Sequence, residues 1–286
     1  MMKLFSEKSI KKALTVIAFS AIAALLLIVV FIILEGLPFI FKVGISDFLF
    51  SSEWEPQMGR FGIFPMIIGS LVVTLGSMIV GIPLALSGAI FLSEFVPRWA
   101  MRIIKPTIEL LAGIPSVVYG FIGVMVLAPL IRDYLGGPGL SILAASIILG
   151  IMILPTILSI SIDSLKAVPQ SYREGAFALG ATHWQTIHMA VLPAAKSGII
   201  AGIILGLGRA IGETMAVIMV TGNAVILPKS PLYSVRTLTA NIALEMGYAT
   251  GMHRQSLFAT GVILLIIIMV LNYTATIAIR RRVGKK

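Results

Sequence analysis

The chain has 286 residues, of which 58% are hydrophobic and only 12% are charged. A soluble globular domain carries about 25% charged residues, so this composition excludes an ordinary soluble domain and indicates lipid as the solvent. The chain has no cysteine, which excludes disulfides and thiolate chemistry. Its formal charge of +10 does not indicate nucleic acid binding, because the basic residues cluster at the ends of apolar runs.

Six apolar runs are each long enough to cross a bilayer as a helix. They predict an all-α integral membrane protein with one transmembrane domain over residues 1–286, whose spans cover about 13–34, 65–92, 108–130, 140–162, 196–220 and 257–279. The alternative for the first run is a cleavable signal peptide. The sequence Glu35-Gly-Leu-Pro38 is a poor cleavage site, so we expect an uncleaved first span.

The distribution of Lys and Arg predicts the orientation, because cytoplasmic segments carry an excess of both. With six spans and a cytoplasmic N-terminus, 15 of these residues fall inside and 6 outside, and Arg209 falls within a span. The outside residues are Lys42, Arg60, Arg132, Lys229, Arg236 and Arg254. We therefore expect a multi-pass protein of the inner membrane with both termini in the cytoplasm.

The segment 169–193 is polar enough to leave the membrane between the fourth and fifth spans. Pro169 suits the first turn of a helix, and Gly180 suits its end, where a left-handed conformation is common. Thr182 then begins a second helix with Gln185 as its capping-box partner, and Pro193 closes the element before the next apolar run. The prediction is a helix, a glycine turn and a second helix on the cytoplasmic membrane surface.

This segment resembles the EAA loop of ABC importer permeases. The residues at the spacing of the family pattern are Glu174, Ala176, Gly180, Leu192 and Pro193. Gly175 stands in place of the first Ala of the pattern, and Ala190 in place of its Ile, so small or apolar character is kept. The resemblance implies that the loop docks into a groove on a cytoplasmic ATPase and passes its motion to the membrane. The alternative is an ordinary amphipathic connector.

The fifth span carries Arg209 and Glu213. An Arg or Asp at the centre of a span costs roughly 2.5–3.5 kcal/mol on insertion scales, so such residues are expected to be paired or to face water. Four residues apart on a helix, Arg209 and Glu213 can touch. They share a face, within about 40° around the helix axis, with Gly198, Gly202 and Gly206. Small residues at this spacing let helices approach closely, so this face should turn toward a neighbouring helix or the pathway. The alternative is a structural salt bridge.

A second resemblance is sharper. Residues 208–214, Gly-Arg-Ala-Ile-Gly-Glu-Thr, are similar to a segment of the phosphate-specific (Pst) ABC transporter permeases. Residues 107–120 resemble the third-span segment of the same family, including the run from Leu111 to Gly120, and residues 54–65 resemble its C-type subunit. The resemblance implies a type I ABC importer permease fold and half of the translocation pathway for inorganic phosphate. It implies no catalytic residues, since ATP hydrolysis belongs to a separate subunit.

The resemblance also implies partners, namely an A-type permease subunit, two copies of a cytoplasmic ABC ATPase and an extracytoplasmic phosphate-binding protein. Arg offers phosphate a permanent charge and a forked set of donors. Weaker hydrogen bonds would come from hydroxyl groups, and Glu213 would hold Arg209 and pair with it when the pathway is empty. The pathway residues expected are Arg209, Glu213, Thr214 and Ser116. No cofactor or metal is expected, because His183, His188 and His253 do not have ligand spacing.

Three alternatives remain open. In the first alternative, the chain is a permease of the same kind whose substrate is another oxyanion, such as sulfate or molybdate. A second alternative is an ATP-independent secondary phosphate transporter, against which the EAA-like loop argues. A third is a membrane scaffold that senses phosphate supply without transporting it.

Overall fold

The computed structural model describes residues 7–283. This part of the chain is mainly helical and contains six helical runs that are long and apolar enough to cross a membrane, which confirms the predicted fold class. The helices are α1 (Glu7–Val43), α2 (Ile45–Phe50), α3 (Phe64–Glu94), α4 (Arg98–Ala112), α5 (Ser116–Ile122), α6 (Ala128–Leu135), α7 (Ile142–Lys166), α8 (Gln170–Ala178), α9 (His183–Thr186), α10 (Leu192–Gly212), α11 (Met215–Val220), α12 (Leu238–Glu245) and α13 (Gly251–Val283).

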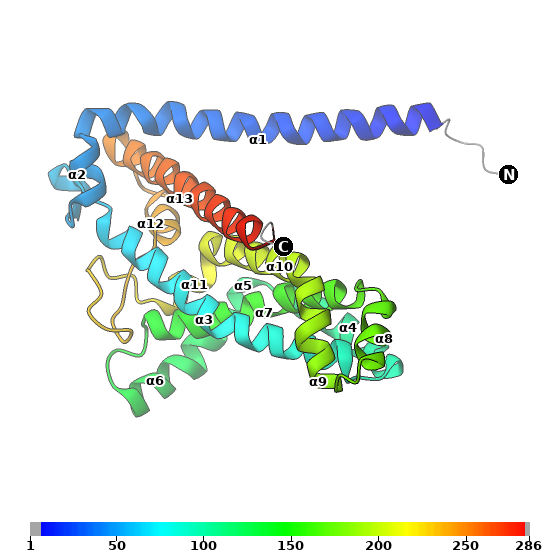
Figure 1. Cartoon of the computed structure of the whole chain (residues 1–286). Coiled ribbons are helices and arrows are strands. Elements are labelled where there is room, and N and C mark those ends of the chain that lie inside the picture. The colour runs from blue at the N-terminus through cyan, green and yellow to red at the C-terminus, as the bar shows by residue number, and fades with distance from the viewer. Residues whose placement is uncertain (1–6, 284–286) are drawn as a thin grey trace.

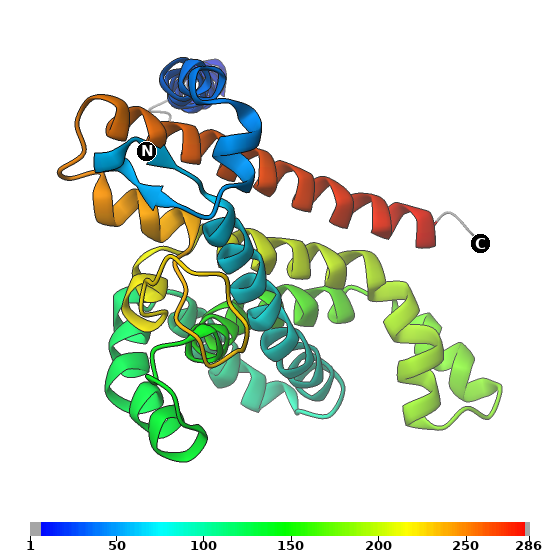
Figure 2. The same cartoon turned by 90° about the vertical axis from the view of Figure 1, so that its left-hand side faces the viewer.

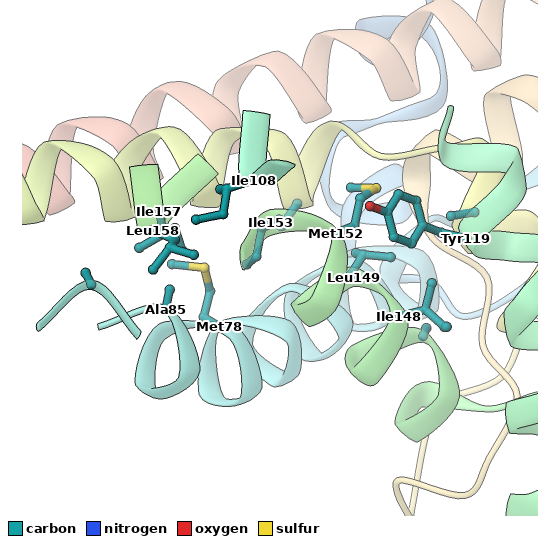
Figure 3. Close-up of a cluster of buried hydrophobic side chains, with 14 of the residues drawn as sticks. Met78, Ala85, Ile108, Tyr119, Ile148, Leu149, Met152, Ile153, Ile157 and Leu158 are labelled. Atoms are coloured by element: carbon teal, nitrogen blue, oxygen red, sulfur yellow. The ribbon is translucent and has the colours of Figure 1, made fainter. Parts of the chain in front are cut away.

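The helix α7 forms the centre of the bundle, with α3 and α10 packed along it. Small residues make this packing close, since a methyl group on Gly81 of α3 would lie 2.9 Å from the Gly150 carbonyl oxygen of α7. Apolar side chains of α7 such as Leu149, Met152 and Ile153 are buried in the cluster shown in Figure 3. The helix α7 is therefore the most buried of the candidate spans, and both α3 and α10 pack against it.

The two ends of the bundle differ in content (Figure 1). One end carries α2, α12 and a short hairpin of β1 (Trp54–Glu55) and β2 (Arg60–Phe61), joined by the turn η1 (Pro56–Met58). Aromatic side chains of this end form a second apolar cluster with α13. The opposite end carries α4, α8 and α9, and both the start of α1 and the end of α13 are directed toward it (Figures 1 and 2).

The helices α3 and α7 lie close to the predicted second and fourth spans, whereas the other bounds differ. The helix α1 continues through Pro38 to Val43, so residues 35–43 belong to the first helix, beyond the predicted end of the first span at residue 34. The last helix, α13, begins at Gly251, before the predicted start at residue 257. Away from its contact with α13, α1 extends from the bundle with its apolar side chains exposed.

The predicted third span, 108–130, needs correction. Residues Arg98–Ala112 form the separate helix α4, and helical geometry ends at Gly113–Pro115. Proline lacks an N–H and disfavours helical geometry in the residue before it, so the apolar run is split at this point. The run of membrane length begins at Ser116 and continues through α5, the π turn η2 (Gly123–Leu127) and α6 to Leu135.

The predicted fifth span, 196–220, also needs correction at both ends. The helix α9, the π turn η3 (Ile187–Val191) and α10 form one helical run from His183 to Gly212. Pro193 does not close the loop, because it lies within this continuous run, just after the π turn, where its missing N–H leaves one backbone hydrogen bond of the helix unformed. After Gly212 the chain becomes extended at Glu213 (φ −68°, ψ 134°), and α11 is a separate helix.

Candidate functional site

Arg209 lies in the last turn of α10 and reaches two other helices. Its guanidinium donates one hydrogen bond to Thr156 Oγ1 of α7 (3.2 Å) and one to the backbone carbonyl of Ala112 (3.3 Å), the last residue of α4. That carbonyl belongs to the end of a helix, where the last four carbonyls have no partner within the helix. Arg209 therefore connects the two places at which helices of the bundle are interrupted.

The predicted pairing of Arg209 with Glu213 was wrong. The prediction assumed a continuous helix, but α10 ends at Gly212, and no ion pair joins Arg209 and Glu213 within 4.0 Å in the part of the chain that the structure describes. The Glu213 carboxylate instead accepts a hydrogen bond from the Ala216 N–H (3.2 Å) in the first turn of α11. An acidic group is favourable at the N-terminus of a helix, so Glu213 stabilises the start of α11. The hypothesis that phosphate competes with Glu213 for Arg209 is therefore dropped.

The predicted hydroxyl donors lie near the same interruptions. Ser116 is half-buried and begins α5, directly after Gly113–Pro115. The Thr214 hydroxyl donates to the Gly212 carbonyl (3.3 Å). It thus bonds a backbone carbonyl of its own segment. Arg209 is hydrogen-bonded to the first interruption, at Ala112. Among the described residues, no hydrogen bond or ion pair joins the side chains of the four predicted pathway residues.

The two short helices that follow these interruptions pack against each other. A methyl group on Gly120 of α5 would lie 2.6 Å from the sulfur of Met219 and 3.1 Å from the Cα of Ala216, both on α11. Gly120 therefore permits the close approach of α5 to α11. The two broken spans form one local unit, with polar backbone groups next to Arg209, and irregular backbone at membrane depth is typical of a transport pathway.

The glycine stripe of the fifth span lies against α7. Gly198 faces Ser164, Gly202 faces Ile160, and Gly206 faces Ile157. A methyl group on Gly206 would lie only 2.7 Å from Cγ1 and Cδ1 of Ile157. The stripe thus turns toward a neighbouring helix, and it sets the distance between α10 and the central helix of the bundle.

The first part of the segment 169–193 has the predicted local structure. The helix α8 ends before Gly180, whose positive φ of 81° favours glycine. Thr182 and Gln185 form a complete capping box: the Gln185 N–H donates to Thr182 Oγ1 (3.3 Å), and the Thr182 N–H donates to Gln185 Oε1 (2.8 Å). This confirms the helix, glycine turn and second helix, which lie at one end of the bundle (Figure 1).

The loop from α8 to α9 exposes several large apolar side chains. Glu174 is exposed, and Leu179 has 90% of its surface exposed next to the turn. Large exposed side chains surround them, namely Tyr172, Phe177, Trp184 and Met189. An exposed apolar patch rimmed by polar residues is typical of a protein interaction site. Of the remaining residues predicted for the loop, Ala176 and Leu192 are half-buried and Pro193 is exposed.

A buried ion pair fixes the loop to the bundle. Arg173 of α8 donates two hydrogen bonds to the carboxylate of Glu94, the last residue of α3, at 2.7 and 3.3 Å. It also donates to the carbonyls of Leu165 (3.1 Å) and Val168 (3.0 Å). The two side chains are only 5% (Glu94) and 15% (Arg173) exposed, and His183 Nε2 lies 4.0 Å from the same carboxylate.

Sequence reasoning did not find this pair. Glu94 and Arg173 are 79 residues apart, and no spacing rule connects them. The available signal was weak: Glu94 is an acidic residue directly after an apolar run, and Arg173 is a basic residue beside the EAA-like Glu174. Thr156, the partner of Arg209, was missed for the same reason, because it looks like one of many hydroxyl residues in an apolar span.

Comparisons with known proteins place the chain among membrane transport components. The sequence profile of the family described as "Binding-protein-dependent transport system inner membrane component" matches residues 81–285. A probable ABC transporter permease protein, YqgH of Bacillus subtilis, is 43% identical over 94% of this chain and 90% of its own. The phosphate transport system permease protein PstC of Xylella fastidiosa is 40% identical over 78% and 75%, and that of Haemophilus influenzae is 32% identical over 87% and 88%.

Solved structures show the same fold at low sequence identity. A bacterial alginate ABC transporter, in complex with a periplasmic protein that holds an alginate pentasaccharide, contains a chain with a TM-score of 0.66 and 14% identity, over 100% of this chain and 99% of that one. A chain of the inward-facing MetNI methionine ABC transporter has a TM-score of 0.58 and 18% identity, over 80% and 99%. These likenesses confirm the predicted type I ABC importer permease fold.

Proposed function

Because this chain belongs to the family of binding-protein-dependent transport system inner membrane components, we propose that it is the permease subunit of an ATP-driven importer of inorganic phosphate. It forms half of the transmembrane pathway and has no catalytic role, since ATP is hydrolysed on a separate subunit. The naming of relatives at 32–40% identity as phosphate transport permeases supports the substrate.

Arg209 is the observation that carries the proposal in the structure. Both of its hydrogen-bond acceptors, the Thr156 hydroxyl and the Ala112 carbonyl, are neutral. No described carboxylate forms an ion pair with it within 4.0 Å, so its charge is not neutralised by the part of the chain that the structure covers. A guanidinium has five N–H donors, of which two are used here. The remaining donors suit a tetrahedral oxyanion that presents several oxygens.

The position of Arg209 suits a pathway. An ionised side chain inside a membrane span normally faces the interior of a bundle or a water-filled cavity. Arg209 lies where both α10 and α4 end, so unpaired backbone groups and the charge occur together. Phosphate would pass this place after the bundle opens to the outside, and release would follow when the bundle opens to the cytoplasm.

The loop from α8 to α9 is the proposed docking site for the ATPase. The contact surface consists of the exposed residues Glu174, Leu179 and Trp184. Movement of this loop would reach α3 through the ion pair between Arg173 and Glu94. We propose two ATPase copies, one on this chain and one on an A-type permease partner, and an extracytoplasmic phosphate-binding protein at the end with α2 and α12. The structural relative that transports alginate is in complex with a periplasmic protein that holds an alginate pentasaccharide, which supports the kind of partner.

The orientation follows from the same loop. The loop must lie in the cytoplasm to meet an ATPase, and the start of α1 and the end of α13 are directed toward the same end of the bundle. Both termini are therefore cytoplasmic in the proposed topology, which agrees with the excess of Lys and Arg on that side.

The decisive experiment measures uptake of labelled phosphate into proteoliposomes that contain the complete complex and its binding protein, with ATP at the ATPase side. The test variant is Arg209→Gln, and the control is Arg132→Gln, which removes the same charge from an exposed side chain of α6. We expect ATP-dependent uptake that is lost in the test variant and kept in the control.

Other results would separate the alternatives. Uptake that does not depend on ATP would indicate a secondary transporter, and ATP-driven uptake of sulfate or molybdate in place of phosphate would overturn the substrate. An assembled complex without any uptake would favour the scaffold. The docking surface is tested in the same preparation by Glu174→Lys and Leu179→Asp, which should lower the amount of bound ATPase while the permease pair stays intact.

A further inference from the structure

The helix α4 carries a charged stripe on one face. Arg98, Arg102, Lys105 and Glu109 follow one another at steps of four, three and four residues, which is the spacing of neighbours on a helix surface. All four line one cavity of about 930 Å³ between α4, the end of α7 and the start of α8. Lys166 of α7 and Arg173 of α8 line it from the other side.

The charges in this cavity are not balanced. Lys105 pairs with Asp163 at 2.6 Å, and this hydrogen bond raises the pKa of the Lys105 ammonium above its ordinary value. Arg173 pairs with Glu94. The other three cations, at positions 98, 102 and 166, form no ion pair within 4.0 Å in the described part of the chain. Glu109 is the only carboxylate among the lining residues, so the cavity keeps an excess of positive charge.

The apolar residues of α4 place the cavity at the membrane surface. Met101 and Ile108 are buried against the bundle. Trp99 (70% exposed), Ile103 and Leu110 point away from it. A helix with a basic stripe and an exposed Trp beside aliphatic side chains is typical of the bilayer interface, where Trp settles at headgroup level. The opening of the cavity therefore lies at the depth of lipid phosphates.

We propose that this cavity is a binding site for a phosphate group, supplied by an anionic phospholipid headgroup or by inorganic phosphate. Arg98 and Arg102 contribute forked donors, and Lys166 contributes a point charge from the facing helix. Basic pockets between helices on the cytoplasmic side of membrane proteins bind anionic headgroups in this way. The site is separate from Arg209, and it does not depend on which anion the transport pathway carries.

The site has a structural consequence for the docking loop. Its wall includes Val168–Gln170, the entry to α8, and Arg173, which holds that helix to α3. A phosphate group in the cavity would connect α4 with the base of α8. Occupancy is thus expected to reduce the mobility of the loop that meets the ATPase.

Binding is tested on the complete complex in lipid nanodiscs. The first arm varies phosphatidylglycerol in a phosphatidylcholine background and counts the anionic lipids retained on the complex by native mass spectrometry. The second arm uses phosphatidylcholine alone and measures binding of labelled inorganic phosphate, in an Arg209→Gln background that removes the proposed pathway cation. The readout in both arms is binding, so failure of transport does not affect the result.

The test variant is Arg98→Gln with Arg102→Gln. The control is Arg132→Gln with Lys229→Gln, which removes the same charge from exposed side chains outside the cavity. From the usual contribution of a basic residue at an anionic surface, we expect about 30-fold weaker binding in the test variant and little change in the control. If the double variant does not assemble, Arg102→Gln alone is compared with Arg132→Gln.

Each result has a defined meaning. A loss confined to the phosphatidylglycerol arm assigns the site to a lipid headgroup, and a loss confined to the phosphate arm assigns it to free phosphate. Equal binding by the test variant and the control, or no binding in either arm by the unsubstituted complex, would overturn the proposal.

Discussion

The ion pair between Glu94 and Arg173 gives a prediction whose size follows from its burial. In Arg173→Met the Glu94 carboxylate, which is 5% exposed, loses both of its guanidinium hydrogen bonds. Removing one partner of a buried pair costs about 3–5 kcal/mol, because a charge remains buried without compensation. Arg173 is 15% exposed, so the lower end applies. About 3 kcal/mol corresponds to a roughly 150-fold larger population in which α8 is detached from α3.

Hydrogen–deuterium exchange of the α8 amides in the nanodisc complex measures this population. The second variant is Arg173→Met combined with Glu94→Leu, since replacing both members of a buried pair by apolar residues is often neutral. The double variant should recover most of the protection. The control is Arg60→Met, which breaks the pair with Glu53 at the other end, where both side chains are more than half exposed and the pair contributes about 0–1 kcal/mol.

Unchanged exchange in Arg173→Met would refute the anchoring role. Equal loss of protection in the single and double variants would show that the packing of the Arg173 side chain matters more than the uncompensated charge.

Two further predictions concern the fifth span. Gly206→Val should lower the thermal unfolding midpoint of the purified complex, because the valine side chain would meet Ile157 and overpacking costs about 1–3 kcal/mol. Gly208→Val is the control, since a methyl group there would meet no neighbouring atom within 4 Å. Equal midpoints for the two variants would contradict the expected contact. Thr156→Val removes one acceptor of Arg209 without removing the charge, so phosphate uptake should fall less than in Arg209→Gln, and a loss as large as that of Arg209→Gln would show that Thr156 has a direct role in the pathway.

The sequence predicts the spans well where apolar length alone decides. The helices α3 and α7 were predicted within a few residues because charged residues, or the Gly-Pro turn at residues 136–139, bound their apolar runs. The capping box at Thr182 and Gln185 was predicted for a similar reason, since its hydrogen bonds involve residues three positions apart. Both kinds of prediction depend on local chemistry.

The errors occur where helices end inside apolar sequence. Residues 108–130 contain no change of polarity at Gly113–Pro115, so hydropathy does not separate α4 from α5. The end of α10 at Gly212 is equally hidden, and it changes the partner of Glu213. The contacts of Arg209 with Thr156 and Ala112 join residues 53 and 97 positions apart, and no pattern along the chain encodes them.

The continuity of the fifth span connects the proposed docking loop with Arg209. The helical run from His183 to Gly212 has 30 residues, which at 1.5 Å per residue is about 45 Å long. Its first residue lies beside the Glu94–Arg173 pair, and Arg209 lies in its last turn. The two acceptors of Arg209 belong to α7 and α4, which are not part of this run. If the loop is displaced along this run, the guanidinium moves relative to its acceptors, so the two hydrogen bonds of Arg209 are the ones that we expect such a displacement to lengthen.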